Sequence, residues 1–199
     1  MENYKKNLEL LTKNYVYSKE MEHDACGVGL IASTEGKKSR AVVEYGIEAL
    51  KAVWHRGAVD ADGKTGDGAG IHVEIPKDFF IEKIEVTGHD YDNSEICVGM
   101  IFLPRNDYSA QENCKTIVES ELTKNNFSIY GWRQVPVNPK VLGEKALQTM
   151  PEIIQVLFKS NNPNLLDKNL ERKIYETRKR IENKAFNASL NNFYICSIS

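Results

Sequence analysis

The 199-residue sequence lacks long apolar runs and a strong charge of either sign. No stretch reaches the run of about 18 apolar residues that a membrane-spanning helix needs. The first 25 residues also lack the apolar centre of a secretory signal. A formal net charge of −2 gives no reason to expect nucleic acid or an anionic membrane as a partner. We therefore expect a soluble cytoplasmic protein whose partners include neither nucleic acid nor a membrane.

Cysteine is scarce, with single residues at positions 26, 97, 114 and 196. Their spacing matches no zinc or iron–sulfur motif and is too sparse for a disulfide framework, so we expect reduced thiols and no metal site. Cys97 and Cys196 lie in apolar, strand-like stretches, which favours the core for both. Cys26 follows the polar residues His23 and Asp24 and opens the apolar stretch GVGLIA. A small buried side chain and a reactive thiol both remain possible for Cys26.

Hydropathy patterns predict a mixed helix and strand chain with a layered α/β or α+β architecture. Residues 1–25 are polar and compatible with a short helix outside the core, which we expect to begin at Cys26. The final stretch FYICSIS stops inside an apolar strand, which indicates the front portion of a longer protein. We expect strands over 27–32, 71–76, 95–104, 127–137 and 193–199, helices over 43–54, 77–84, 110–126 and 164–186, a long loop over 58–69, and a looser region over 151–158.

Three short segments could carry chemistry: CGVG at 26–29, HRGA at 55–58 and TGDGAGI at 65–71. A strand is expected after CGVG, where a dinucleotide-binding loop requires a helix. TGDGAGI has no Lys followed by Ser or Thr, so it is no phosphate loop, but its glycines allow backbone to pass close to another group. If the strands that begin at Cys26 and Ile71 are neighbours, Asp67, Gly68 and the HRGA turn gather near the thiol.

The HRGA segment ends the helix predicted over 43–54, and Gly57 there suits the left-handed conformation that closes helices. His55 and Arg56 then have two interpretations. Cations at this end complement the helix dipole and its last carbonyl groups. The planar guanidinium of Arg56 is also well suited to hold a carboxylate.

Taken together, HDACGVGLIA, ALKAVWHRGAVDADGKTGDGAGIHVEIP with the following KDFF, and YGWRQVPVNP resemble one known family. The segments are similar to the amino-terminal glutamine amidotransferase domain of the large subunit of glutamate synthase, a class II amidotransferase. The resemblance extends from Cys26 to the last residue. Other class II amidotransferases share only the CG start and an RG turn, and TGDGAGI favours glutamate synthase.

The resemblance implies an α+β fold, the N-terminal nucleophile hydrolase sandwich of two antiparallel sheets between helix layers, incomplete here at the C-terminus. It implies that residues 1–25 are a propeptide cut at Ala25-Cys26 and that residues 26–199 are a truncated amidotransferase domain. No dedicated base other than His23 lies near Cys26 in the sequence. In this family the base is the free α-amino group of the nucleophile itself, which an internal Cys26 lacks because its nitrogen is a planar amide.

The resemblance further assigns Cys26 as the nucleophile that hydrolyses glutamine through a thioester, with Arg56, Gly57, Asp67 and Gly68 as substrate-binding residues. Ammonia would pass to downstream synthase domains of the same chain for reductive synthesis of glutamate from 2-oxoglutarate. These domains would use FMN and an iron–sulfur cluster, and a small NAD(P)H-oxidising subunit could supply electrons. We expect no cofactor in this segment itself.

The sequence ends before the family's second substrate-binding arginine, its Asn-Gly oxyanion pair and the acid that holds the glutamine amino group. Loss of one oxyanion donor costs on the order of 3 kcal/mol of barrier, so we expect little activity from this segment alone. Two alternatives remain open: another class II amidotransferase that feeds a different acceptor, and a non-catalytic interaction module. The electron donor and the oligomeric state do not follow from the sequence.

Overall fold

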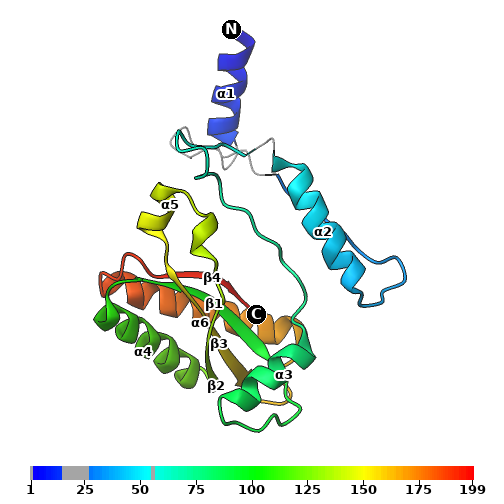
Figure 1. The fold of residues 1–199 in the computed structure, drawn as a ribbon, viewed down its shortest axis with the longest axis vertical. Helices are drawn as coiled ribbons and strands as arrows, with labels where there is room; N and C mark the ends of the chain where they lie inside the picture. Colours follow the sequence, from blue (N-terminus) through cyan, green and yellow to red (C-terminus); the bar gives the residue numbers. More distant parts are fainter. Residues whose placement is uncertain (1, 15–26, 55–56) are drawn as a thin grey trace. The chain divides into compact units, whose positions relative to one another are not determined.

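The computed structural model describes residues 2–14, 27–54 and 57–199 (Figure 1). The chain divides into two compact units, residues 1–57 and residues 58–199, and each unit is described by itself. None of the helices in the described ranges has the length and apolar content of a membrane span.

The first unit contains the helices α1 (Glu2–Asn14) and α2 (Arg40–Ala52). Helix α2 begins where the Ser39 side chain accepts a hydrogen bond from the Ala41 N–H, an N-cap of the usual kind. The predicted helix is thus confirmed, but it ends at Ala52 with Val53 as its C-cap. The prediction that Gly57 adopts a left-handed conformation is wrong, because Gly57 is not among the residues with positive φ. Its N–H instead closes a turn by donating to the Trp54 carbonyl at 3.0 Å.

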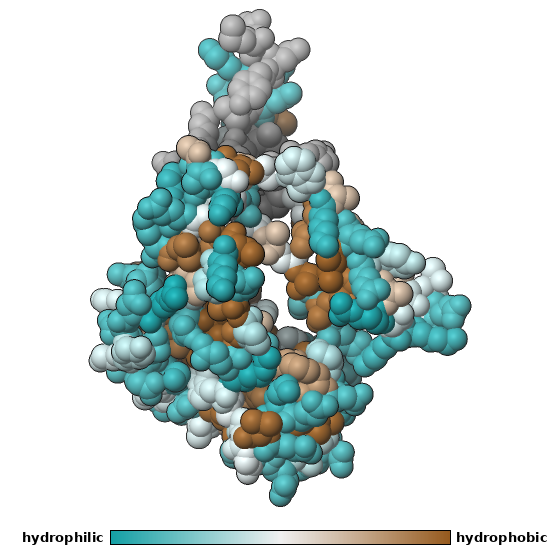
Figure 2. Space-filling model, in the orientation of Figure 1, coloured by the Kyte–Doolittle hydropathy of each residue, from teal (hydrophilic) through white to brown (hydrophobic). Residues whose placement is uncertain are grey.

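Two predicted strands, 27–32 and 71–76, are irregular in the structure. In the first unit Val28 and Leu30 are 94% and 89% exposed, and in the second unit Ile71 is 46% exposed. A strand covered on both faces needs partner strands for its backbone groups, and neither segment pairs with another strand among the described residues. The space-filling view shows patches of apolar side chains among the hydrophilic ones on the visible face (Figure 2).

The second unit is built on one antiparallel sheet with the strand order β2-β3-β1-β4 (Figure 1). Its strands are β1 (Cys97–Leu103), β2 (Phe127–Gln134), β3 (Glu152–Ser160) and β4 (Tyr194–Ile198). The prediction of a looser region over 151–158 is wrong, because these residues form most of β3 in the interior of the sheet. The other three strands confirm the predictions from hydropathy.

Helices cover the two faces of this sheet unequally. They are α3 (Lys77–Val86), α4 (Tyr108–Lys124), the short α5 (Glu144–Thr149) and α6 (Asp167–Asn187), and a 3₁₀ turn η2 spans Pro139–Val141. The main core lies between one face of the sheet and α4 with α6. A smaller core joins α3 to the opposite face through Leu157 and Tyr130. Alternate residues of β3 therefore point into different cores.

Helices α4 and α6 are also joined by an ion pair between a buried glutamate and a partly exposed lysine. The carboxylate of Glu121, 4% exposed, accepts a hydrogen bond from Lys184 on α6. This bond lowers the pKa of Glu121.

The α+β class is confirmed by these elements. The described residues form a single sheet of four strands, so the two-sheet sandwich stays a prediction.

Candidate active site

The residues proposed from the sequence fall in different parts of the chain. Cys26 and Arg56 lie outside the described residues. Gly57 ends the first unit, whereas Asp67 and Gly68 belong to the second. The local structure around Asp67 and Gly68 can therefore be built from the second unit alone.

Residues 58–67, which we call the hairpin, are more ordered than the long loop predicted for them. Val59 and Gly66 form an isolated antiparallel bridge. The Asp60 N–H donates to the Thr65 carbonyl at 2.7 Å. At the tip, Gly63 has a φ of +68°, a left-handed conformation that glycine adopts without strain. The ordering of the hairpin gives Asp67 a fixed place at its end.

Asp67 holds the two ends of the hairpin together. Its N–H donates to the Ala58 carbonyl at 3.2 Å, and its Oδ2 accepts the Ala58 N–H at 2.9 Å. Ala58 directly follows Gly57 in the chain. The Oδ1 atom of Asp67 takes no part in these two hydrogen bonds, so the hairpin is closed through Oδ2 and the backbone.

The glycines beside Asp67 differ in how strongly the structure requires them. A Cβ atom at Gly66 would lie 2.9 Å from the Ala58 carbonyl oxygen, so the bridge demands a glycine there. This confirms that TGDGAGI allows close backbone approach. A Cβ atom at Gly68 would meet nothing within 4 Å, so the hairpin itself does not require a glycine at that position.

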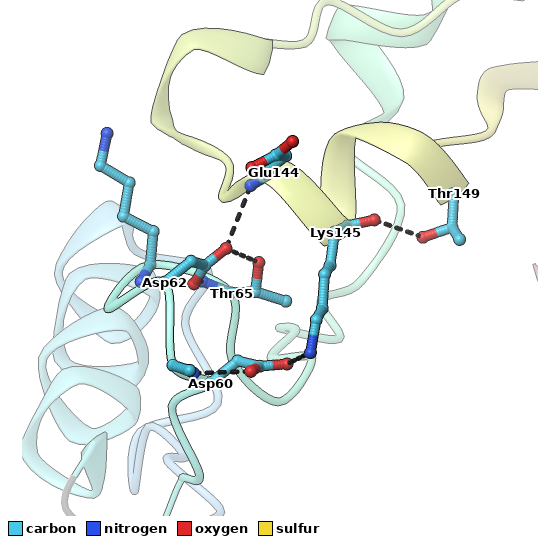
Figure 3. Close-up of polar contacts among 8 residues, drawn as sticks. Asp60, Asp62, Thr65, Glu144, Lys145 and Thr149 are labelled. Carbon is cyan, nitrogen blue, oxygen red and sulfur yellow. Dashed lines mark hydrogen bonds and ion pairs between the residues drawn. The ribbon is translucent and has the colours of Figure 1, made fainter.

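A second carboxylate, that of Asp62, binds the hairpin to helix α5 (Figure 3). Its Oδ1 accepts the N–H groups of Lys64 at 2.9 Å and Thr65 at 2.7 Å. Its Oδ2 accepts the Thr65 hydroxyl at 2.6 Å and the Glu144 N–H at 3.1 Å. The Thr65 hydroxyl and then these backbone groups hold the pKa of Asp62 well below its usual range. Asp62 therefore acts as a carboxylate anchor near neutral pH.

An ion pair strengthens the same attachment. Lys145 Nζ on α5 donates to Asp60 Oδ2 at 2.5 Å (Figure 3). Sequence reasoning missed Asp60, Asp62 and Lys145. The D-A-D-G-K-T segment does carry an aspartate turn signature, because Asp side chains readily bind backbone N–H groups just ahead of them. Nothing in the sequence indicates that this turn contacts Glu144 and Lys145, which lie 82 positions after Asp62 and 85 positions after Asp60.

No group of three or more His, Cys, Asp or Glu side chains in the described ranges is arranged to hold a metal ion. The cysteines there are separate free thiols, Cys97 and Cys114 buried and Cys196 exposed. These thiols do not fit an iron–sulfur cluster.

Comparison with known families identifies the class of protein. Residues 26–199 match the model of the class II glutamine amidotransferases, and the match begins at Cys26. This span is most of the chain, so the chain belongs to the class II glutamine amidotransferases.

Its relatives narrow the class further. The chain is 53% identical over 196 residues to the glutamate synthase [NADPH] large chain of Azospirillum brasilense, and the aligned region covers 98% of this chain and 13% of that relative. It is 39% identical over 180 residues to ferredoxin-dependent glutamate synthase 1 of Arabidopsis thaliana, covering 89% and 11%. It is 38% identical over 194 residues to the ferredoxin-dependent glutamate synthase of Pyropia yezoensis, covering 96% and 12%. The chain thus spans roughly an eighth of the length of these relatives.

Proposed function

We propose that this chain supplies the glutamine-hydrolysing site of a glutamate synthase, with Cys26 as its nucleophile. The observation that carries the proposal is the family match that starts at Cys26 itself. The identity to glutamate synthases over nearly the whole chain supports the same choice within the family.

The proposed reaction has two steps. The Cys26 thiolate attacks the side-chain amide carbon of glutamine, a C–S bond forms, and the C–N bond breaks as ammonia leaves. Water then attacks the γ-glutamyl thioester, the C–S bond breaks, and glutamate is released with the thiol restored. A thiol needs a proton acceptor for the first step, and an α-amino group with a pKa of about 7.7–8.0 suits this transfer near neutral pH.

That α-amino group exists only if residues 1–25 are removed. The proposal therefore includes cleavage between Ala25 and Cys26, after which the Cys26 amine takes the thiol proton and passes it to the departing ammonia. Without cleavage the Cys26 nitrogen is a planar amide that cannot act as a base.

The substrate contacts are proposed for Arg56, Gly57, Asp67 and Gly68. The guanidinium of Arg56 provides a forked pair of donors that matches the α-carboxylate of glutamine. Asp67 offers an oxygen that the hairpin does not use, which suits an ammonium or amide N–H group of the substrate. The bond from Asp67 to Ala58 supports this role because it fixes the carboxylate in one orientation.

The names of the relatives support a proposal for the fate of the ammonia. We propose that downstream domains of the complete gene product add it to 2-oxoglutarate and reduce the product to a second glutamate. FMN and an iron–sulfur cluster would belong to those domains, and no step described for this segment uses them. The higher identity to a relative named for NADPH than to those named for ferredoxin favours NADPH as the electron donor, through a small NAD(P)H-oxidising subunit.

The test is the Cys26→Ser substitution in the complete gene product. We expect loss of glutamine-dependent glutamate synthesis and retention of ammonia-dependent synthesis, both followed by glutamate formation from 2-oxoglutarate. Cys196→Ser is the matched control, because Cys196 is an exposed thiol on the edge strand β4. Retained glutamine-dependent activity in Cys26→Ser, or equal loss of both activities, would contradict the proposal. Glutamine hydrolysis with no glutamate synthesis would instead indicate another class II amidotransferase.

A further inference from the structure

We infer that Asp60, Asp62 and Lys145 form a positioning device that fixes the Asp67–Gly68 segment for glutamine binding. This inference rests on the proposed function for its kinetic consequence. Its structural part rests on the second unit alone, which contains both the hairpin and α5.

The attachment joins parts of the chain that are far apart in sequence. Figure 3 shows the Lys145 side chain extending from α5 to Asp60, while the Asp62 carboxylate faces the backbone N–H of Glu144. The hairpin is therefore held at two points on α5. One is a partly exposed ion pair, and the other is a charge-assisted hydrogen bond from the Glu144 N–H to the Asp62 carboxylate.

Gly143 provides an independent sign that this docking is specific. A Cβ atom at Gly143 would overlap the Thr65 hydroxyl oxygen and Asp62 Oδ2. The hairpin thus packs directly against the backbone that precedes α5. A side chain at position 143 would push the hairpin away from α5, since Thr65 N also lies within the space that it would occupy.

The positioning device acts on the Asp67–Gly68 segment through the few residues that connect the two. Thr65 is anchored by Asp62, and only Gly66 separates it from Asp67. Lys145 and Asp60 side chains are 66% and 32% exposed, so their pair contributes little to global stability. Their effect should therefore be on where Asp67 and Gly68 lie rather than on whether the unit folds.

The first experiment is Lys145→Met in the complete gene product. We expect the KM for glutamine to rise about tenfold, because small displacements of positioning groups are costly in well-oriented reactions. The ammonia-dependent activity and the melting temperature should not change. Arg172→Met is the matched control, since Arg172 makes an exposed ion pair with Glu176 on α6.

Rescue separates positioning from a general structural effect. Lys145→Arg should keep the wild-type KM for glutamine. The double exchange Asp60→Lys with Lys145→Asp should reverse most of the rise in KM seen in Lys145→Met. A wild-type KM in Lys145→Met, or equal changes in Lys145→Met and Arg172→Met, would overturn the inference.

Amide hydrogen exchange gives a readout that does not require activity. The Thr65 and Asp67 amides should exchange about tenfold faster in Lys145→Met than in Arg172→Met, because local opening controls their exchange. Equal exchange rates would overturn the inference even if the wild type proved inactive. An inactive wild type with altered exchange would instead refute only the proposed function.

Discussion

The carboxylates of Asp62 and Asp67 show how much of this site depends on hydrogen bonds from the backbone. Each binds N–H groups that a turn would otherwise leave to water, and each uses at least one oxygen in this way. A single charged side chain can therefore set the path of several residues. For Asp62 this role has a measurable dependence on pH.

We predict that Asp62 supports the hairpin down to about pH 4 and loses that role only in stronger acid. The folded pKa is depressed below the ordinary value of about 3.9, so the stabilisation is complete above the ordinary pKa and is lost as pH falls through the lower folded value. The protection factor of the Thr65 amide in hydrogen exchange should stay constant from pH 6 to pH 4. In Asp62→Asn it should be low throughout, and a wild-type decline between pH 6 and pH 4 would refute the prediction.

The thiols illustrate where residue-level prediction succeeds. Cys97 was expected in the core, and burial there raises its pKa to about 12. Cys196 was also expected in the core and is exposed, so that prediction was wrong. The register of β4 shifts, with Met100 opposite Ser197 and Ile101 opposite Ile195, so Cys196 is the extra residue of a bulge. An apolar stretch alone does not reveal such a shift.

At the level of elements, helices were the most predictable part of the fold. The helical repeats over 43–54, 77–84, 110–126 and 164–186 correspond to α2, α3, α4 and α6. Their apolar residues recur every three or four positions, a pattern that needs no knowledge of distant partners. Helix α5 was not predicted, because its six residues carry too short a repeat.

Strands were predicted less well because pairing depends on distant segments. The stretch EIIQVLF in β3 has the apolar, β-branched composition of a buried strand, and the prediction of a looser region there is wrong. The stretches over 27–32 and 71–76 have similar composition and lie outside the sheet. The candidate site follows the same rule: Asp67 is proposed from its local motif, whereas the contact of Lys145 with Asp60 is seen only in the tertiary structure.

The main core offers a test of the sheet. We predict that Ile101→Ala lowers the free energy of unfolding of the 199-residue chain by about 2–5 kcal/mol, the usual cost of an Ile to Ala cavity. Ile101 is fully buried on the central strand β1. Urea denaturation followed by circular dichroism measures the change. Val86→Ala, at an exposed position on α3, should shift stability by less than about 0.5 kcal/mol, and a similar loss in both variants would contradict the assignment of the core.

At the scale of the whole molecule, the leader is the part of the proposal most open to direct measurement. Residues 2–14 form α1, in agreement with the short helix considered for the leader, but a helix does not decide whether the leader is removed. The family match starts at Cys26, the residue at which the proposed cleavage would place the new amino terminus.

We predict that the active complete gene product begins at Cys26. Amino-terminal sequencing or intact-mass analysis should show loss of residues 1–25, because the free amine of Cys26 is needed as the proton acceptor. Ala25→Pro, which should impede cleavage, is expected to reduce glutamine-dependent activity and to spare ammonia-dependent activity. Active enzyme that retains Met1 would exclude this mechanism.

The large sequence separation between Asp60 and Lys145 also sets an order of events during translation. These residues are 85 positions apart, and ribosomes add about 5–20 residues per second, so Lys145 is made roughly 4–17 s after Asp60. Strands β1 and β2 are both translated in that interval, before α5 exists. Half of the strands of the sheet are therefore synthesised before the Asp67–Gly68 segment can be fixed against α5.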